Sequence, residues 1–326
     1  MRTKQSYDKA PSLRFLPLLI CLLSQTFAAT SNRSGNSSDL TISTNVDLVA
    51  LDVGVKDTKG GYVSGLTKDN FRIYENGKLQ PIKNFSHADI PVTVGLVIDN
   101  SGSMAAKRPE VVTAALTFVH ASNPRDEVFV VNFNDRVRPG LPADVPFTGD
   151  IHMLREALWK GASAGRTALY DALGYSLRHL VKGRMDKKTL IVVSDGGDNA
   201  SKLQWSEALR RVQESRATIY TIGIFDENDP DRNPDVLKKL AQISGGEYFL
   251  LRELPDVVPV CRQIASDIRN RYTLTYTPPQ NNSRQPARSI RVTASTPARA
   301  RLIVHTRTRY IMPERASATP PKGVEP

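Results

Sequence analysis

Three oxygen-bearing side chains alternate along the residues that follow a short apolar segment. The run Val94–Ile98 leads into Asp99, and Ser101 and Ser103 come next at alternate positions. A β-branched run of this length is typical of a strand buried on both faces, and Gly102 allows a tight turn after it. Carboxylate and hydroxyl oxygens at the carboxyl end of such a strand suit a small divalent cation such as Mg²⁺. The pattern is also compatible with an ordinary turn in which a serine caps the next helix.

Two further oxygen groups occur at comparable places later in the chain. Thr167 lies in a loop just before a helical pattern, and Asp195 follows the apolar run Thr189–Ser194. Neighbouring strand ends of a doubly wound sheet meet at one edge, where ligands bind. We therefore expect five side chains from three segments to converge there, namely Asp99, Ser101, Ser103, Thr167 and Asp195.

This set of five resembles the metal-ion-dependent adhesion site of von Willebrand factor type A domains, over residues 92–270. The resemblance implies that Ser101, Ser103 and Thr167 bind the cation directly, whereas Asp99 and Asp195 act mostly through water. Neutral hydroxyl ligands leave the cation electrophilic, so an Asp or Glu of a protein partner could complete the octahedron. The implied function is metal-dependent protein binding or adhesion, without catalysis, using Mg²⁺ or else Mn²⁺ or Ca²⁺.

Strands and helices alternate between Pro91 and Asn270. This alternation predicts an α/β fold, a doubly wound and mostly parallel sheet of Rossmann-like type with helices on both faces. The expected strands are Val94–Asp99, Glu127–Phe133, Thr189–Ser194, Thr218–Ile224 and Glu247–Leu251. The expected helices are Ala105–His120, Ile151–Trp159, Leu169–Val181, Trp205–Ser215, Asp235–Ser244 and Pro255–Asn270.

Both flanks of this region have a β pattern. Residues 40–90 read as successive hairpins, and residues 271–312 contain three expected strands, Tyr272–Tyr276, Ser289–Ala294 and Arg301–Arg309. Neither flank has enough strands to close a domain alone. We therefore expect one small antiparallel β domain formed by both chain ends, with the type A domain, residues 91–270, inserted into it. These flanks resemble a bacterial family of secreted type A proteins.

The N-terminus has the pattern of a secretory signal. Basic residues precede the apolar core Phe15–Leu23, which is shorter than the roughly 20 residues that a membrane-spanning helix needs. Cleavage after Ala28 would leave residues 29–39 as a linker, and residues 313–326 read as a flexible tail. The chain is therefore expected in the periplasm, in the cell envelope or outside the cell, with an uncleaved anchor as the alternative.

Several function classes lack their motifs in this sequence. The two cysteines, Cys21 and Cys261, do not have the spacing of a zinc site. The histidines form no H-E-x-x-H pair, and there is no G-x-G-x-x-G loop or Walker loop, so no nucleotide is expected. Two alternatives stay open, a metal-dependent hydrolase at the same sheet edge and a structural module whose β domain makes the contacts.

The net charge is +11, and arginines are concentrated near the C-terminus. Over residues Arg299–Arg309, a period of two would place arginines on one face together with His305. These arginines are Arg299, Arg301, Arg307 and Arg309. The face could protect a solvated edge strand, or it could contact an anionic surface such as lipid head groups or polysaccharide. Export argues against nucleic acid as a partner.

Overall fold

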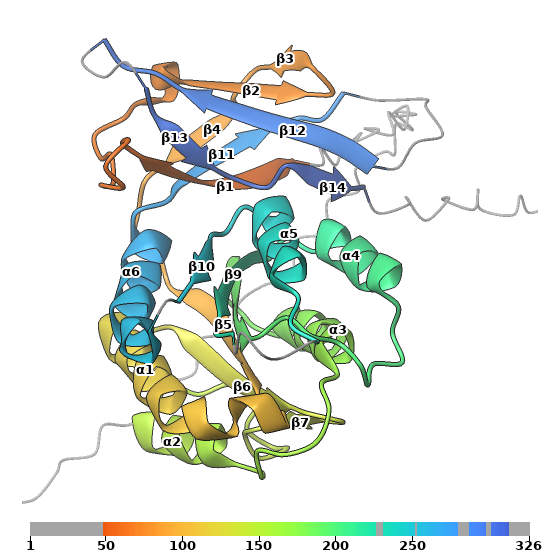
Figure 1. Cartoon of the computed structure of the whole chain (residues 1–326). Helices are drawn as coiled ribbons and strands as arrows, with labels where there is room; N and C mark the ends of the chain where they lie inside the picture. The colour runs from red at the N-terminus through yellow and green to blue at the C-terminus, as the bar shows by residue number, and fades with distance from the viewer. Residues whose placement is uncertain (1–47, 226–230, 252, 280–286, 298–300, 313–326) are drawn as a thin grey trace, which may run out of the picture. The chain divides into compact units, whose positions relative to one another are not determined.

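The computed structural model describes residues 48–225, 231–251, 253–279, 287–297 and 301–312 (Figure 1). All of them belong to one compact unit, Val46–Pro326. The expected signal peptide, linker and tail lie outside the described residues. No helix within the described ranges is both long enough and apolar enough to cross a membrane.

A six-stranded sheet with the strand order β10-β9-β8-β5-β6-β7 forms the centre of the α/β region. Every neighbouring pair is parallel except β6 and β7. The β-branched run of the central strand is buried at all eight positions, as expected for a strand covered on both faces. The bounds are β5 Val92–Asp99, β6 Glu127–Phe133, β7 Val137–Pro139, β8 Lys187–Ser194, β9 Thr218–Gly223 and β10 Tyr248–Leu250.

Helices cover both faces of this sheet. One group comprises α1 Arg108–Ala121, α2 Ile151–Trp159 and α6 Val257–Arg269, in which α1 packs against the other two. The other comprises α3 Leu169–Leu180, α4 Trp205–Glu214 and α5 Pro234–Ser244, in which α4 packs against its two neighbours. The first expected helix begins later than predicted because residues Gly102–Lys107 form a 3₁₀ helix. The α/β fold class is confirmed.

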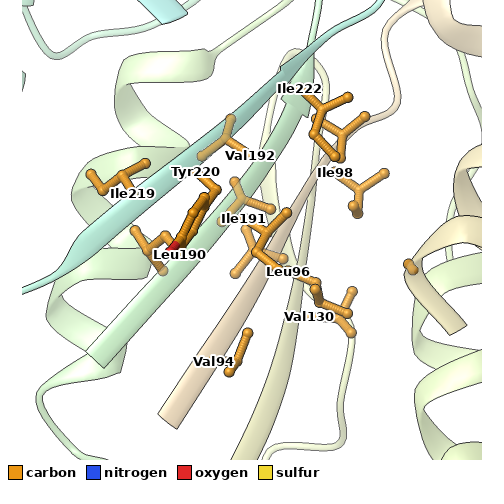
Figure 2. Close-up of a cluster of buried hydrophobic side chains, with 14 of the residues drawn as sticks. Val94, Leu96, Ile98, Val130, Leu190, Ile191, Val192, Ile219, Tyr220 and Ile222 are labelled. Carbon is orange, nitrogen blue, oxygen red and sulfur yellow. The ribbon is translucent and has the colours of Figure 1, made fainter. Parts of the chain in front are cut away.

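Apolar side chains of neighbouring strands meet in the interior (Figure 2). Leu96 and Ile98 of β5 lie beside Ile191 of β8, with side chains of β6 and β9 around them. Gly95 has no space for a side chain, because a Cβ atom would lie 2.4 Å from the Phe129 ring. Tight packing of this kind fixes where each strand ends, and the strand ends position the candidate site.

Two antiparallel sheets form a sandwich from both flanks of the α/β region, as predicted. Their strand orders are β13-β1-β11-β4 and β14-β12-β2-β3. Figure 1 shows orange strands from before the α/β region beside blue strands from after it. The bounds are β1 Val49–Lys56, β2 Phe71–Glu75, β3 Lys78–Gln80, β4 Asn84–Ser86, β11 Tyr272–Tyr276, β12 Ala287–Ala294, β13 Ile303–His305 and β14 Arg309–Ile311. The expected domain limits at residues 90 and 270 fall between elements and stay predictions.

The expected single strand Arg301–Arg309 is wrong. The segment forms β13, which pairs with β1, and β14, which pairs with β12 in the other sheet. The chain passes between the two sheets at residues 306–308, so the alternation of side chains does not continue across them. Arg301 and Arg309 are exposed, whereas the Arg307 guanidinium donates to the carbonyl oxygens of Gln213 and Ser215. Arg299 lies outside the described residues.

Arg271, between α6 and β11, joins the sandwich to the α/β region. Its side chain is 3% exposed. Nη2 donates to the carbonyl oxygens of Asp52 at 3.0 Å, Gly245 at 2.7 Å and His305 at 3.1 Å. Nη1 lies 3.1 Å from Asp267 Oδ2 and donates to the Tyr220 hydroxyl. One buried guanidinium thus satisfies backbone groups of β1 and β13 and side chains of β9 and α6.

Candidate metal centre

Adjacent parallel strands bring the two carboxylates of the site together. Asp99 is the last residue of β5, and Asp195 directly follows β8. The two strands are paired in parallel as far as Ile98 and Val193. The carboxyl groups therefore lie at the same edge of the sheet, where parallel α/β sheets bind ligands. Both residues are buried, at 2% and 3% exposure.

Hydrogen bonds connect four of the five expected site residues. Ser103 Oγ donates to Asp195 Oδ2 at 2.6 Å, and the Ser101 and Ser103 hydroxyl oxygens are 3.2 Å apart. Asp99 Oδ1 accepts from the Ser101 amide at 2.8 Å, and its Oδ2 accepts from Ser194 Oγ at 2.6 Å. The side-chain oxygens of the strand end and the following turn thus form one cluster.

The fifth residue, Thr167, lies in a loop held against this turn. The Gly102 amide donates to the Gly165 carbonyl at 3.1 Å, and the Ala164 amide donates to the Asn100 carbonyl at 3.0 Å. Gly165 has φ +87°, which a side chain would strain, and a Cβ atom there would lie 1.9 Å from Asp135 Oδ2. Thr167 itself is 6% exposed. The loop therefore places the Thr167 segment at the edge that carries Asp99 and Asp195.

Burial and charge leave the two carboxylates uncompensated. Burial and the neighbouring Asp195 charge raise the pKa of Asp99 to about 7, although hydrogen bonds from Ser194 and Ser101 act in the opposite direction. Within the described ranges, neither carboxylate forms an ion pair with Lys, Arg or His. Two buried acids without a cationic side chain are the arrangement that a bound cation would neutralise.

The donor set also fits a small hard cation in size. Ligands of an octahedral Mg²⁺ ion lie at about 2.1 Å, so adjacent oxygens are about 3 Å apart. The 3.2 Å separation of the Ser101 and Ser103 hydroxyl oxygens is close to that edge length. Among the described residues, no three or more His, Cys, Asp or Glu side chains are grouped so that they could hold a metal ion by themselves, so the hydroxyl oxygens of this cluster would be needed as ligands. The residues fit Mg²⁺, Mn²⁺ or Ca²⁺.

Two supporting residues were missed by the sequence reasoning. Ser194 donates to Asp99, and it also accepts from the Gly196 amide at 3.0 Å. Asn199 Oδ1 accepts from the Thr167 amide at 2.9 Å, and its Nδ2 donates to an Asp231 carboxylate oxygen at 2.6 Å. The only sequence signal for either residue is its closeness to Asp195, because the partner of each side chain lies in another segment.

We expect Asn199→Ala to lower the affinity for Mg²⁺ about tenfold, because partners that orient metal ligands typically contribute 10- to 100-fold. Without the Asn199 side chain, the backbone N–H of Thr167 would lose its hydrogen-bond acceptor. Isothermal titration with MgCl₂ measures the change. Asn84→Ala in the sandwich is the matched control and should bind as the wild type does. Equal affinities for the two variants would contradict the assigned role.

Cys261 lies on α6 with 3% exposure. Burial raises the pKa of its thiol to about 12. A thiol of this kind is a packed side chain and not a nucleophile, since the thiolate is the reactive form. Cys261 is therefore not a candidate nucleophile.

The expected result is slow modification of Cys261 in the native state. With Cys21 replaced by serine, a thiol reagent at pH 8 should react more than about 100-fold faster after unfolding than before, because the native thiol is both buried and protonated. Absorbance of the released thiolate follows the reaction with and without denaturant. Rapid labelling of the folded protein would contradict the burial.

Comparisons with known proteins identify the family of the α/β region. The family model of the von Willebrand factor type A domain matches residues 93–258, just over half of the chain. The chain belongs to this family. Type A domains are often adhesion or protein-interaction modules, and they bind divalent metal at a site of this kind. A search of curated proteins found no match.

Several solved structures are similar to this type A chain. A von Willebrand factor type A protein from Catenulispora acidiphila is 15% identical, with a TM-score of 0.50, and the match covers 83% of this chain and 76% of that one. The vWF domain of the type V pili tip protein Mfa5 from Porphyromonas gingivalis is 16% identical over 55% and 95%, with a TM-score of 0.47. Mussel byssus proximal thread matrix protein 1 with a zinc-occupied MIDAS motif is 15% identical over 56% and 49%, with a TM-score of 0.46. At 15% identity, the similarity to the Catenulispora acidiphila protein supports the fold alone.

Proposed function

We propose that this type A protein is an exported, non-enzymatic binding module that captures an acidic group of a protein partner through a divalent cation. The cation is Mg²⁺, or else Mn²⁺ or Ca²⁺. It would be held by Asp99, Ser101, Ser103, Thr167 and Asp195, in the manner of a metal-ion-dependent adhesion site. Export to the periplasm, the cell envelope or the exterior rests on the N-terminal signal pattern.

The observation that carries the proposal is the oxygen cluster at the sheet edge. Asp195 accepts a hydrogen bond from Ser103, and the Ser103 hydroxyl lies beside that of Ser101. The oxygens of three side chains from two strand ends are therefore close enough together to bind one cation. Ser103 is half-buried and Gly102 is exposed, so this position is open to a partner. When bound, the cation would supply the attraction for the partner's Asp or Glu. Ser101 and Ser103 would contribute neutral oxygens, and buried Asp99 would orient the turn through the Ser101 amide.

The same geometry favours binding over hydrolysis. A hydrolase would need a general base or nucleophile beside the cation. Among the described residues, no histidine hydrogen-bonds to any of the five site residues. Asp99 and Asp195 already accept hydrogen bonds from Ser194 and Ser103. The carboxylates therefore serve to organise the site.

The test is a cross-linked pull-down from the native envelope fraction, with and without a chelator. The wild type should retain a partner in MgCl₂ and lose it in EDTA. The double variant Ser101→Ala with Ser103→Ala should lose the partner under both conditions, because its two hydroxyl oxygens are gone. Ser206→Ala, at an exposed position of α4, is the matched control. Capture that does not respond to chelator or to the double variant would refute the proposal.

A second candidate function, contact with an anionic surface, rests on one face of the β14-β12-β2-β3 sheet. Cross-strand pairs place exposed arginines of three strands on this face, namely Arg72, Arg291 and Arg309. The Arg291 guanidinium lies 4.0 Å from the Tyr74 ring centroid. The other positions paired across this face are uncharged, namely Tyr74, Leu79, Ala287, Ser289, Thr293 and Ile311. Contact with an anionic surface, first suggested by the arginines of residues 299–309, is therefore proposed for this face. Arg301 is also exposed.

Replacing Arg72, Arg291 and Arg309 with glutamine should weaken binding to vesicles of anionic phospholipid about 100-fold. Each basic residue near such a surface contributes about 1 kcal/mol. Vesicle flotation at physiological salt measures the change. Glutamine at the exposed Arg125, Arg155 and Arg232 gives a control with the same net charge. If both triple variants bind equally, only the overall charge of the protein matters.

A further inference from the structure

A cavity of about 330 Å³ lies at the opposite end of the sheet from the metal centre. Lys187 and Thr218, the first residues of β8 and β9, line one side of it. Ala50 and Asp52 of β1 line another. The volume is within the range of sites for small ligands. The cavity is also lined by charged side chains, namely Asp186, Arg216 and Arg307.

The charged side chains that line the cavity carry a net charge of +1, from Lys187, Arg216 and Arg307 against Asp52 and Asp186. Lys187 Nζ lies 3.6 Å from Asp52 Oδ1, so these two residues neutralise each other. Asp186 is exposed. Arg216 and Arg307 form no ion pair with a described carboxylate. Two guanidinium groups therefore line one cavity without an acidic partner for either.

Of these two arginines, Arg307 has the less favourable environment for a positive charge. Its Nη2 donates to the carbonyl oxygens of Gln213 at 3.0 Å and Ser215 at 2.7 Å, at the carboxyl end of α4. Its Nε is buried and has no hydrogen-bond partner in the structure. Burial and, to a smaller extent, the charge of Arg216 lower the pKa of Arg307 to about 10, although the coulombic effect of Tyr310 acts in the opposite direction. A half-buried cation close to a like charge is unfavourable unless an anion compensates it.

We infer that this cavity binds a small, doubly charged oxyanion of the phosphate type between Arg216 and Arg307. A guanidinium group presents parallel donors that match phosphate oxygens, and the two guanidinium groups supply two positive charges toward an anion, against one from the exposed Asp186 carboxylate. The cavity volume of about 330 Å³ exceeds what bare phosphate needs. A phosphate monoester of a small molecule would therefore also fit. The inference does not depend on the metal centre, because no residue of that site lines the cavity.

Thermal unfolding of the full chain in EDTA tests the site apart from bound metal. Inorganic phosphate at about ten times its Kd should raise Tm by about 3 °C relative to sodium chloride of equal ionic strength. Glycerol phosphate is tested in a parallel series. A similar rise in Tm with both ligands would show that the cavity recognises the phosphate group alone. A larger rise with glycerol phosphate would identify a phosphate monoester as the preferred ligand. The same Tm in chloride as in both phosphates would overturn the inference.

Variants of Arg216 separate a specific site from a general salt effect. Arg216 is exposed, so its replacement should not prevent folding. Arg216→Gln should abolish the rise in Tm caused by phosphate. Arg216→Glu should place a carboxylate near Arg307, raise Tm in chloride and remove the response to phosphate. Arg155→Gln, at an exposed position of α2, should respond as the wild type does. An unchanged phosphate response in both Arg216 variants would overturn the inference.

Discussion

Asp99→Asn is expected to stabilise the metal-free protein and at the same time to remove most of its stabilisation by Mg²⁺. The asparagine would keep the acceptor for the Ser101 amide, and its amide group would donate to Ser194 Oγ. It would remove a buried negative charge beside Asp195. Effective burial of one ion costs several kcal/mol, so we expect the free energy of unfolding in EDTA to rise by about 2 kcal/mol.

The response to metal should change in the opposite direction. At 100 times its Kd, Mg²⁺ should stabilise the wild type by about 2.7 kcal/mol. We expect the affinity of Asp99→Asn to be about 100-fold lower, because the charge that orients the turn and compensates the cation is lost. Under the same conditions the variant would then gain only about 0.4 kcal/mol.

Denaturant unfolding at pH 8, in EDTA and in MgCl₂, measures both effects. Asp144→Asn, in an exposed loop, is the matched control and should change neither value. Equal stabilisation of Asp99→Asn and the wild type by Mg²⁺ would show that Asp99 has no part in the site. A variant that is less stable than the wild type in EDTA would show that the buried charge is already compensated.

Arg271→Ala is expected to cost about 3–5 kcal/mol of the free energy of unfolding. Removing one partner of a buried ion pair leaves the other charge uncompensated, and here that charge is Asp267, at 2% exposure. The change would also leave the carbonyl oxygens of Asp52, Gly245 and His305 without this donor. Because these groups belong to both the sandwich and the α/β region, the two should unfold less cooperatively.

Arg210→Ala is the control for this prediction. Arg210 forms ion pairs with Glu207 and Glu214 on the surface of α4. Exposed pairs of this kind contribute about 0–1 kcal/mol, so its loss should be small although it removes two ion pairs. Denaturant unfolding followed by circular dichroism measures both variants. A loss below 1 kcal/mol for Arg271→Ala would show that the buried network does not hold the two regions together.

The sequence was most informative where local pattern and topology agree. The strand Glu127–Phe133 and the helix Ile151–Trp159 have the bounds that their patterns predicted. Each combines a clear period with a turn or cap at its end, such as Asp150, whose side chain accepts from the amides of His152 and Met153. The convergence of Asp99 and Asp195 was also predictable, because parallel strands end at a common edge.

The sequence was least informative where one segment serves two sheets. The period of two in Arg301–Arg309 describes a local preference, but it does not say which neighbour each part of the segment pairs with. In the structure β1 takes residues 303–305 and β12 takes residues 309–311. Arg307 is turned toward the end of α4, a helix about ninety residues earlier in the chain.

By itself, the sequence determined the α/β fold class and the antiparallel sheets made from both flanks, and it predicted the set of five site residues. These follow from periodicity and from the rule that neighbouring strand ends meet. Only the tertiary structure decided the partners of the polar groups, with Ser194 on Asp99 and Asn199 on the Thr167 amide, and the presence of Arg216 and Arg307 at one cavity. Such partners are far apart in the chain, and only the packing of the sheets and helices brings them within hydrogen-bonding distance or into one cavity.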